Sequence, residues 1–254
     1  MTQKPNFKKS RQAGFSLIEL TISILILVLI MGAVFKQVDN IQKNTKTESM
    51  KLDLTQQNRD FVDRFARDIH MSGYPISKVY QNSGGPTDKT IALGLVAATP
   101  TYLRFEGDVY GDGTVYSVEY KYYESDVNDA NCPCLRRSVQ PKQPADPLLV
   151  DATGVGGTLG QLPAVYYTEV QNLIDPTGMS QGLFTYFEAN GNVVNVGTNG
   201  IGYNGSAAPI VSDPATLQKI DAIKVNLSTR SSQVDMQTGQ NVVNSIATIA
   251  ELEN

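Results

Sequence analysis

The side chains able to do chemistry in this sequence are few. There are two cysteines, Cys132 and Cys134, and one histidine, His70. A metal cage of cysteine and histidine ligands, or a cysteine nucleophile with a histidine base, therefore has almost no residues from which to form. An enzyme that uses only carboxylates, or a serine with a lysine, remains possible, although no spacing indicates one. We therefore expect a protein that is not an enzyme and that holds no cofactor.

Cys132 and Cys134 lie on either side of a single proline. In an oxidising compartment they could form a disulfide within this three-residue span, or remain two thiols that pair with another chain. The internal disulfide is favoured because the chain has no other cysteine. Closing so short a loop adds little stability.

The stretch "GDVYGDGTV" places Asp108 and Asp112 beside glycines, as at the start of a calcium loop. It lacks the regular aspartate spacing and the closing bidentate glutamate of such a loop. We therefore predict a polar turn between two strands and no metal site. Asp108 and Asp112 remain weak candidates for metal ligands.

Glu19 is the single formal charge in an otherwise apolar run over residues 15–35. A helix of 21 residues is about 32 Å long, close to the hydrocarbon thickness of a membrane, so the run predicts a transmembrane helix. A secretory signal peptide is the alternative. Its apolar core is usually shorter and ends in a small-x-small cleavage site, and "LIMGAVFKQ" offers only a poor one.

Residues 36–75 predict an amphipathic helix that continues the apolar one. No proline or glycine occurs from residue 36 to residue 72, and apolar residues recur at helical spacing. They are Val38, Ile41, Leu54, Phe61, Phe65 and Ile69, with Val62 and Ala66 beside them. Gly73 should cap the helix and Pro75 should block its continuation. His70 lies near this end, where an imidazolium favours the helix dipole, so a capping role is expected rather than catalysis.

Residues 76–254 predict a β-rich domain, so the fold class is α+β, with the long helix packed on an antiparallel sheet. In "TVYSVEYKYYE" and "AIKVNLS" apolar and polar residues alternate, as in half-buried strands. The stripe of Tyr116, Val118, Tyr120 and Tyr122 should face the long helix as core. The glycine-rich stretches "GVGGTLG" and "VGTNGIGYNG" indicate loops.

The charge is unevenly distributed. Residues 1–14 hold Lys4, Lys8, Lys9 and Arg11 and no acidic residue, whereas the whole chain has 21 basic and 25 acidic residues. Beyond residue 14 this leaves 17 basic and 25 acidic residues, a net charge of -8. So acidic a body argues against binding to nucleic-acid phosphates.

The basic leader, the Gly14-Phe15 junction, Glu19 and the apolar helix together resemble the class III signal of type IV pilins and pseudopilins. In that family a membrane-embedded prepilin peptidase cuts after the glycine and methylates the new N-terminus. The resemblance implies that residues 1–14 are a leader, that the chain is cleaved between Gly14 and Phe15, and that Phe15 becomes N-methylated. The apolar helix would be retained.

Glu19 gains a role from this resemblance. A carboxylate inside a membrane segment is costly and tends to find a partner, and cleavage would create one in the charged amine of Phe15. In a filament of staggered subunits, Glu19 of one subunit can meet the Phe15 amine of a neighbour. The carboxylate also lies in the first helical turn, where the helix dipole favours it.

Later segments look like those of PilW-type minor pilins. "FARDIHMSGYP" at residues 65–75 is similar to the end of that family's helix, while the tyrosine-rich strand, "CLRR" and "IDAIKVNLSTR" resemble its sheet. The sequence departs from the family at His70, where arginine is frequent, and at Ser72, where alanine is frequent.

The resemblance implies a minor pilin that helps to initiate and assemble a type IV pilus. Its partners would be the prepilin peptidase, other minor pilins, the major pilin and the inner-membrane assembly platform. The chain would cross the bacterial inner membrane once through residues 15–35, with an extracytoplasmic head, and then enter the pilus or periplasm. The alternatives are a J-type pseudopilin of type II secretion, an adhesin or DNA-uptake subunit at the pilus tip, and a membrane-anchored enzyme.

Overall fold

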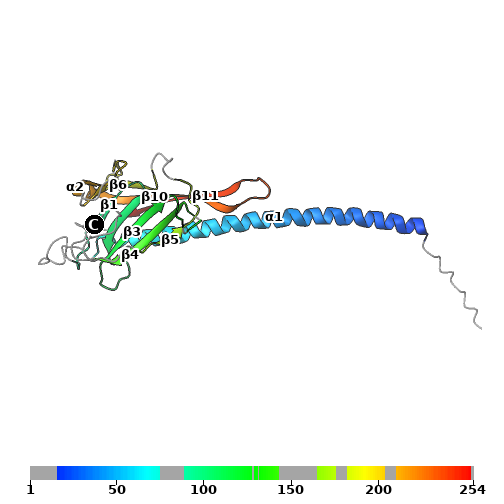
Figure 1. The fold of residues 1–254 in the computed structure, drawn as a ribbon, viewed down its shortest axis with the longest axis horizontal. Coiled ribbons are helices and arrows are strands. Elements are labelled where there is room, and N and C mark those ends of the chain that lie inside the picture. The colour runs from blue at the N-terminus through cyan, green and yellow to red at the C-terminus, as the bar shows by residue number, and fades with distance from the viewer. Residues whose placement is uncertain are drawn as a thin grey trace, which may run out of the picture. The chain divides into compact units, whose positions relative to one another are not determined.

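The computed structural model describes residues 16–74, 89–127, 129–130, 132–142, 165–175, 182–203 and 210–252 (Figure 1). The chain divides into two units, Met1–Glu48 and Ser49–Asn254. The described part of the first unit is helical from Leu17. The second unit holds the rest of this long helix, a short second helix and all the strands among the described residues. The α+β class expected from the sequence is confirmed.

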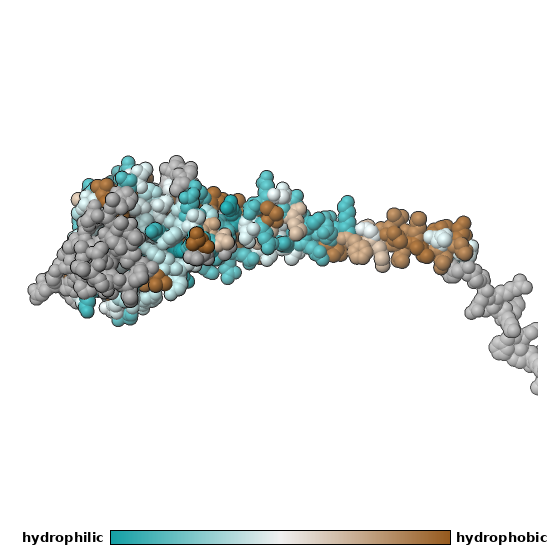
Figure 2. Space-filling model, in the orientation of Figure 1, coloured by the Kyte–Doolittle hydropathy of each residue, from teal (hydrophilic) through white to brown (hydrophobic). Residues whose placement is uncertain are grey.

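Helix α1 spans Leu17–His70. This segment contains no proline and one glycine, Gly32, so nothing in its sequence interrupts the helix. Figure 2 shows hydrophobic side chains gathered along the N-terminal part of α1, where they are exposed. An 18-residue window of this helix has a mean hydropathy of 2.7 and none of it is buried. Among the described residues, α1 is the helix long and apolar enough to cross a membrane.

The larger sheet has seven strands in the order β5-β4-β3-β2-β1-β8-β9. All neighbouring pairs are antiparallel except β8 with β9. The strands are β1 (Gly94–Ala98), β2 (Tyr102–Gly107), β3 (Tyr116–Tyr123), β4 (Cys134–Pro141), β5 (Tyr167–Val170), β8 (Ile201–Gly202) and β9 (Val211–Ser212). The pairing of β3 with β4 is regular from Tyr116 opposite Pro141 to Tyr123 opposite Cys134.

The smaller sheet has four strands in the order β11-β10-β6-β7, all antiparallel. They are β6 (Phe184–Glu188), β7 (Val193–Val194), β10 (Ile220–Val234) and β11 (Asn241–Glu251), and the short helix α2 (Pro214–Leu217) precedes β10. Strands β10 and β11 form a long hairpin, in register from Ala222 opposite Glu251 to Arg230 opposite Val243.

One hydrophobic core joins the C-terminal part of α1 to both sheets. The Phe65 ring centroid is 5.4 Å from that of Tyr120 on β3 and 6.0 Å from that of Phe184 on β6. Phe61 and Ile69 lie in the same core, at 2% and 0% exposure. Burial of such side chains contributes roughly 1.5–3 kcal/mol each, so this stripe holds the helix on the head.

The predicted apolar stripe of the helix is therefore confirmed at Leu54, Phe61, Phe65 and Ile69, which are buried. The tyrosine stripe also faces the core as expected, with Val118 and Tyr120 fully buried and Tyr116 and Tyr122 packed at its margin. The opposite face of β3 differs from the prediction, because Ser117 and Glu119 are buried rather than exposed. On the same face, Arg104 of β2 donates from Nε to Ser117 Oγ at 2.9 Å.

Two local predictions differ from the structure. The helix ends at His70, and residues 71–73 form a turn in which Gly73 has a positive φ of 84°. In the stretch expected to be a loop at residues 196–205, Ile201 and Gly202 form β8, because their backbones pair with Ala98 and Ala97 of β1. The other predicted loop, at residues 154–160, lies outside the described residues.

Candidate functional site

Glu19 lies in the first turn of α1 and is exposed. Its backbone carbonyl accepts a hydrogen bond from Ser23 Oγ at 2.8 Å, and its amide donates to the carbonyl of Ser16 at 3.0 Å. Among the described residues no side chain pairs with its carboxylate. The carboxylate is therefore available for a partner outside the described part of the chain. Gly14 and Phe15, the residues of the expected cleavage site, lie outside the described residues.

At the other end of α1, an aspartate pairs with the larger sheet. Asp68, only 5% exposed, accepts a hydrogen bond from the Tyr120 hydroxyl at 2.6 Å and one from Arg137 Nε at 2.7 Å. Tyr120 lies on β3 and Arg137 on β4. The end of α1, the tyrosine-rich strand β3 and strand β4 therefore meet at one buried carboxylate.

The electrostatics of this contact follow from burial. Burial raises the pKa of Tyr120 well above its ordinary value, and the neighbouring Asp68 carboxylate raises that pKa further. The tyrosine therefore remains a neutral donor at any ordinary pH. Asp68 accepts one hydrogen bond from a charged donor and one from a neutral donor, so its own burial is compensated. We call Asp68, Tyr120 and Arg137 the aspartate latch.

A second polar contact joins α1 to the smaller sheet. Asn58, 1% exposed, donates from Nδ2 to Thr229 Oγ1 at 3.0 Å and to Asn244 Oδ1 at 3.2 Å. Asn244 in turn donates to Thr55 Oγ1 at 2.7 Å. Thr229 belongs to β10. We call these four residues the asparagine latch.

A third contact between α1 and the head is a surface ion pair. Arg64 Nη1 lies 2.8 Å and 2.7 Å from the two carboxylate oxygens of Glu169 on β5. The Arg64 side chain is 45% exposed, so its net contribution to stability is small, about 0–1 kcal/mol. It fixes where the helix meets the edge of the sheet.

Two buried ion pairs lie on the face of the larger sheet that is opposite to the core. Lys142 Nζ is 2.7 Å from Glu106 Oε2, and both side chains are 0% exposed. Arg104 Nε lies 3.8 Å from Glu119 Oε1, and the Tyr166 hydroxyl donates to the other oxygen of Glu119. Burial raises the pKa of Glu106 by more than the nearby Lys142 cation lowers it. Burial likewise raises the pKa of Glu119 by more than the Arg104 cation lowers it. The paired cations thus offset only part of the burial cost.

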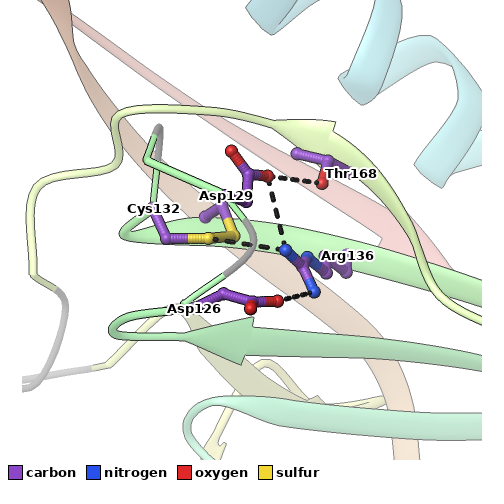
Figure 3. Close-up of a disulfide and its surroundings, with 6 residues drawn as sticks. Asp126, Asp129, Cys132, Arg136 and Thr168 are labelled. Carbon is purple, nitrogen blue, oxygen red and sulfur yellow. Dashed lines mark hydrogen bonds and ion pairs between the residues drawn. A yellow bond between two sulfur atoms is a disulfide. The ribbon is translucent and has the colours of Figure 1, made fainter.

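Cys132 and Cys134 are joined by a disulfide (Figure 3). Arg136 of β4 lies beside it, with Nη2 at 3.8 Å from Cys132 Sγ. The same guanidinium pairs with Asp126 at 2.5 Å and with Asp129 at 3.3 Å, as Figure 3 shows. One carboxylate oxygen of Asp129 and the two sulfurs lie within 4.8 Å of one another, which is metal-ligand spacing. The sulfurs are bonded to each other, so they offer no thiolates to a metal here.

Asp108 and Asp112 hold the turn between β2 and β3. Asp108, 2% exposed, accepts hydrogen bonds from the amides of Asp112 at 3.1 Å and Gly113 at 2.8 Å. Asp112 accepts from the Thr114 amide and from the Tyr116 hydroxyl, each at 2.8 Å. The hydrogen bond from Tyr116 lowers the pKa of Asp112. Both carboxylates are thus used within the turn itself.

His70, in the last turn of α1, is exposed.

Sequence reasoning did not assign roles to Asp68 or Asn58, although a signal was present. Both occupy positions of the apolar stripe, because Asn58 lies four residues after Leu54 and Asp68 lies three after Phe65. A polar residue at such a position must find a hydrogen-bond partner when it is buried, or that part of the helix must face solvent instead of the core. What the sequence lacked was the identity of the partners, which come from strands at least 50 residues away.

Over residues 9–35 the chain matches the family model described as the prokaryotic N-terminal methylation motif. That span includes the Gly14-Phe15 junction, Glu19 and the apolar run. No curated protein and no solved structure matches the chain.

Proposed function

We propose that the chain is a type IV pilin-like protein that serves as a minor pilin in the initiation and assembly of a type IV pilus; the methylation motif and the long N-terminal helix support this. The observation that carries the proposal is the methylation motif, which covers an exposed apolar run whose single carboxylate, Glu19, has no partner among the described residues. Such a helix suits a filament subunit, because neighbouring subunits would cover its apolar side chains and would supply a partner for its carboxylate.

Processing would begin at the peptide bond between Gly14 and Phe15. Its hydrolysis by a prepilin peptidase frees the Phe15 amine, which is then methylated. Glu19 lies four residues further along, and its carboxylate would pair with the amine of a neighbouring subunit in an apolar surrounding, where an ion pair is stronger than in water. The apolar helix first anchors the chain in the inner membrane and then packs among the helices of other pilins.

The head would present a fixed surface to neighbouring subunits. The aspartate and asparagine latches hold α1 against both sheets, so the head cannot rotate freely about its own helix. Fixed orientation matters in a helical filament, because each subunit must offer the same surface to the next. The partners we propose are other minor pilins, the major pilin and the inner-membrane assembly platform.

The resemblance of four segments to PilW-type pilins favours the minor pilin over a pseudopilin, and three of those segments meet at the aspartate latch. A deletion strain distinguishes the two roles. We expect loss or strong reduction of surface pili, counted by electron microscopy, with unchanged secretion of type II substrates. Normal piliation with a secretion defect would reject the pilus assignment in favour of a pseudopilin. Restoration by the wild-type chain supplied on a plasmid is the control.

A further inference from the structure

The disulfide between Cys132 and Cys134 is poorly explained as a stabilising cross-link. It spans a sequence separation of two residues, and the stabilisation from a cross-link falls as the closed loop shortens. The same loop is already held by other contacts. Arg136 pairs with Asp126 and Asp129, and the Leu173 amide donates to the Pro133 carbonyl at 2.8 Å.

The two sulfurs differ in their access to solvent. Cys134, the first residue of β4, is 0% exposed, whereas Cys132 is partly exposed. Cys132 is the more exposed residue of the two, so we expect a nucleophile from solvent to attack Cys132 Sγ, with Cys134 as the leaving group. Thiol–disulfide exchange depends on such access and on how well the leaving thiolate is stabilised.

Arg136 supplies that stabilisation. Its Nη2 is 3.8 Å from Cys132 Sγ, and the bonded Cys134 Sγ can be at most one sulfur–sulfur bond length further from it. A cation this close favours a thiolate over a thiol. The Arg136 Nε group is buried and has no hydrogen-bond partner among the described residues, so the guanidinium retains an unused donor. Asp129 acts in the opposite sense, because its carboxylate oxygen is within 4.8 Å of both sulfurs.

We propose that Cys132–Cys134 is a thiol–disulfide exchange site, at which a dithiol reduces the folded head and a second disulfide, which takes up the two electrons and becomes a pair of thiols, restores it. A thiolate of the dithiol attacks Cys132 Sγ, the sulfur–sulfur bond breaks, and its electron pair passes to Cys134 Sγ. The second thiol of the dithiol loses its proton and attacks the sulfur that joins the dithiol to Cys132. Cys132 leaves as a thiolate, the dithiol becomes a cyclic disulfide, and two electrons have moved to the protein. The natural reagent belongs to the class of extracytoplasmic dithiol oxidoreductases.

The test uses the full-length chain in detergent with dithiothreitol as the probe. Samples are quenched with a maleimide at successive times, and intact mass spectrometry counts the labelled thiols, while near-ultraviolet circular dichroism follows the fold. We expect two thiols to appear while the tyrosine signal stays native. Oxidised glutathione, added after removal of dithiothreitol, should restore the unlabelled mass.

Urea separates reduction of the folded head from reduction after unfolding. Below the unfolding transition, exchange in the folded state should proceed at a rate that hardly changes with urea, whereas reduction through global unfolding becomes steeply faster. A steep rise with urea, or loss of the native signal as the thiols appear, would overturn the proposal.

Two variants test the electrostatic argument in opposite directions. Arg136→Gln should slow reduction about three- to tenfold, because the departing thiolate loses its cation, and Asp129→Asn should accelerate it by a similar factor. Arg64→Gln removes an arginine–carboxylate pair elsewhere on the head and should leave the rate unchanged. Equal rates in all four proteins would show that Arg136 and Asp129 do not act on the sulfurs, and would also overturn the proposal.

Discussion

Two side chains, the buried Tyr120 and the mostly buried Arg137, depend on Asp68. Asp68→Ala leaves the Tyr120 hydroxyl and the Arg137 guanidinium, 12% exposed, without their acceptor. Breaking a buried pair in this way typically costs about 3–5 kcal/mol. We expect a clear fall in the thermal unfolding midpoint of the full-length chain in detergent, measured by circular dichroism.

Two further variants show whether this loss comes from the aspartate latch. The double variant Asp68→Leu with Arg137→Met should recover part of the loss, because both charges are then removed. Arg64→Gln breaks an exposed pair and should lower the free energy of unfolding by no more than about 1 kcal/mol. An Asp68→Ala protein as stable as the wild type would contradict the role given to this latch.

We expect Glu19 to serve assembly rather than folding of the head. Glu19→Val removes a charge from an apolar helix, so insertion into the membrane should become easier by up to about 3 kcal/mol. The protein should be made, cleaved and retained in the membrane, yet co-purify poorly with other minor pilins. Glu19→Asp should be intermediate, because it keeps the charge but has a shorter reach. Normal co-purification and pilus number with Glu19→Val would reject pairing with a neighbouring amine for this subunit.

Glu106 and Glu119 give the head a defined response to pH. Burial holds both pKa values above the ordinary 4.5. A carboxyl with a raised folded pKa binds its proton more tightly in the folded state, so its contribution to stability is full below pH 4.5 and is lost as pH rises through the folded pKa. Glu119→Gln should therefore show a shallower decline in the free energy of unfolding from pH 4.5 upwards. Urea titrations at several pH values measure it, with the exposed Glu251→Gln as the control that keeps the wild-type slope.

At the scale of elements, the end of α1 is packed directly onto the end of β2. Ser72 pairs with Gly107 in an isolated bridge, and the Gly73 amide donates to the Glu106 carbonyl at 2.8 Å. A Cβ on Gly107 would lie 2.1 Å from the Met71 carbonyl oxygen, which is backbone and cannot rotate away. The glycine is therefore required for the close approach of helix and strand.

Gly107→Ala should accordingly force the helix end away from β2 and destabilise the head by about 1–3 kcal/mol, the usual cost of overpacking. The matched control is Gly111→Ala. Gly111 has a φ of 69° but no atom within 4 Å of an added Cβ, so only backbone strain of about 1–2 kcal/mol applies. If backbone strain were the only cost, Gly107→Ala would be harmless, because Gly107 has no positive φ. Thermal unfolding of the two variants distinguishes steric overlap from strain.

The elements themselves were largely predictable from the sequence. The stripe through Leu54, Phe61, Phe65 and Ile69 predicts the buried face of α1, because helical periodicity is a local signal. Alternation predicts β3 and β10 for the same reason. The burial of Glu119 was not predictable, since it depends on Arg104 and Tyr166 reaching the same face. The partners of Asp68 were not predictable either, because strand order is set by contacts distant in sequence.

At the scale of the whole molecule, we expect the fate of the chain to depend on one residue of the leader. Gly14 precedes the expected cleavage site, and a peptidase subsite that accepts bare glycine should reject a larger side chain. Gly14→Val should leave the full-length precursor in the inner membrane, with the leader attached and no pilus. Mass spectrometry that finds a normal mature Phe15 terminus in this variant would count against the class III signal. Gly32→Ala, which adds a methyl group where no atom lies within 4 Å, should be processed normally.

The spacing of the contacts along α1 has a mechanical consequence. The asparagine latch, the Arg64–Glu169 pair and the aspartate latch lie at residues 58, 64 and 68, over about 15 Å of helix. A pull along the helix therefore loads all three contacts in shear at the same time, together with the aromatic stripe between them. Contacts loaded side by side share the force, whereas contacts loaded in sequence fail one after another. A head secured in this way should withstand traction on its helix that would peel off a head held at one end alone.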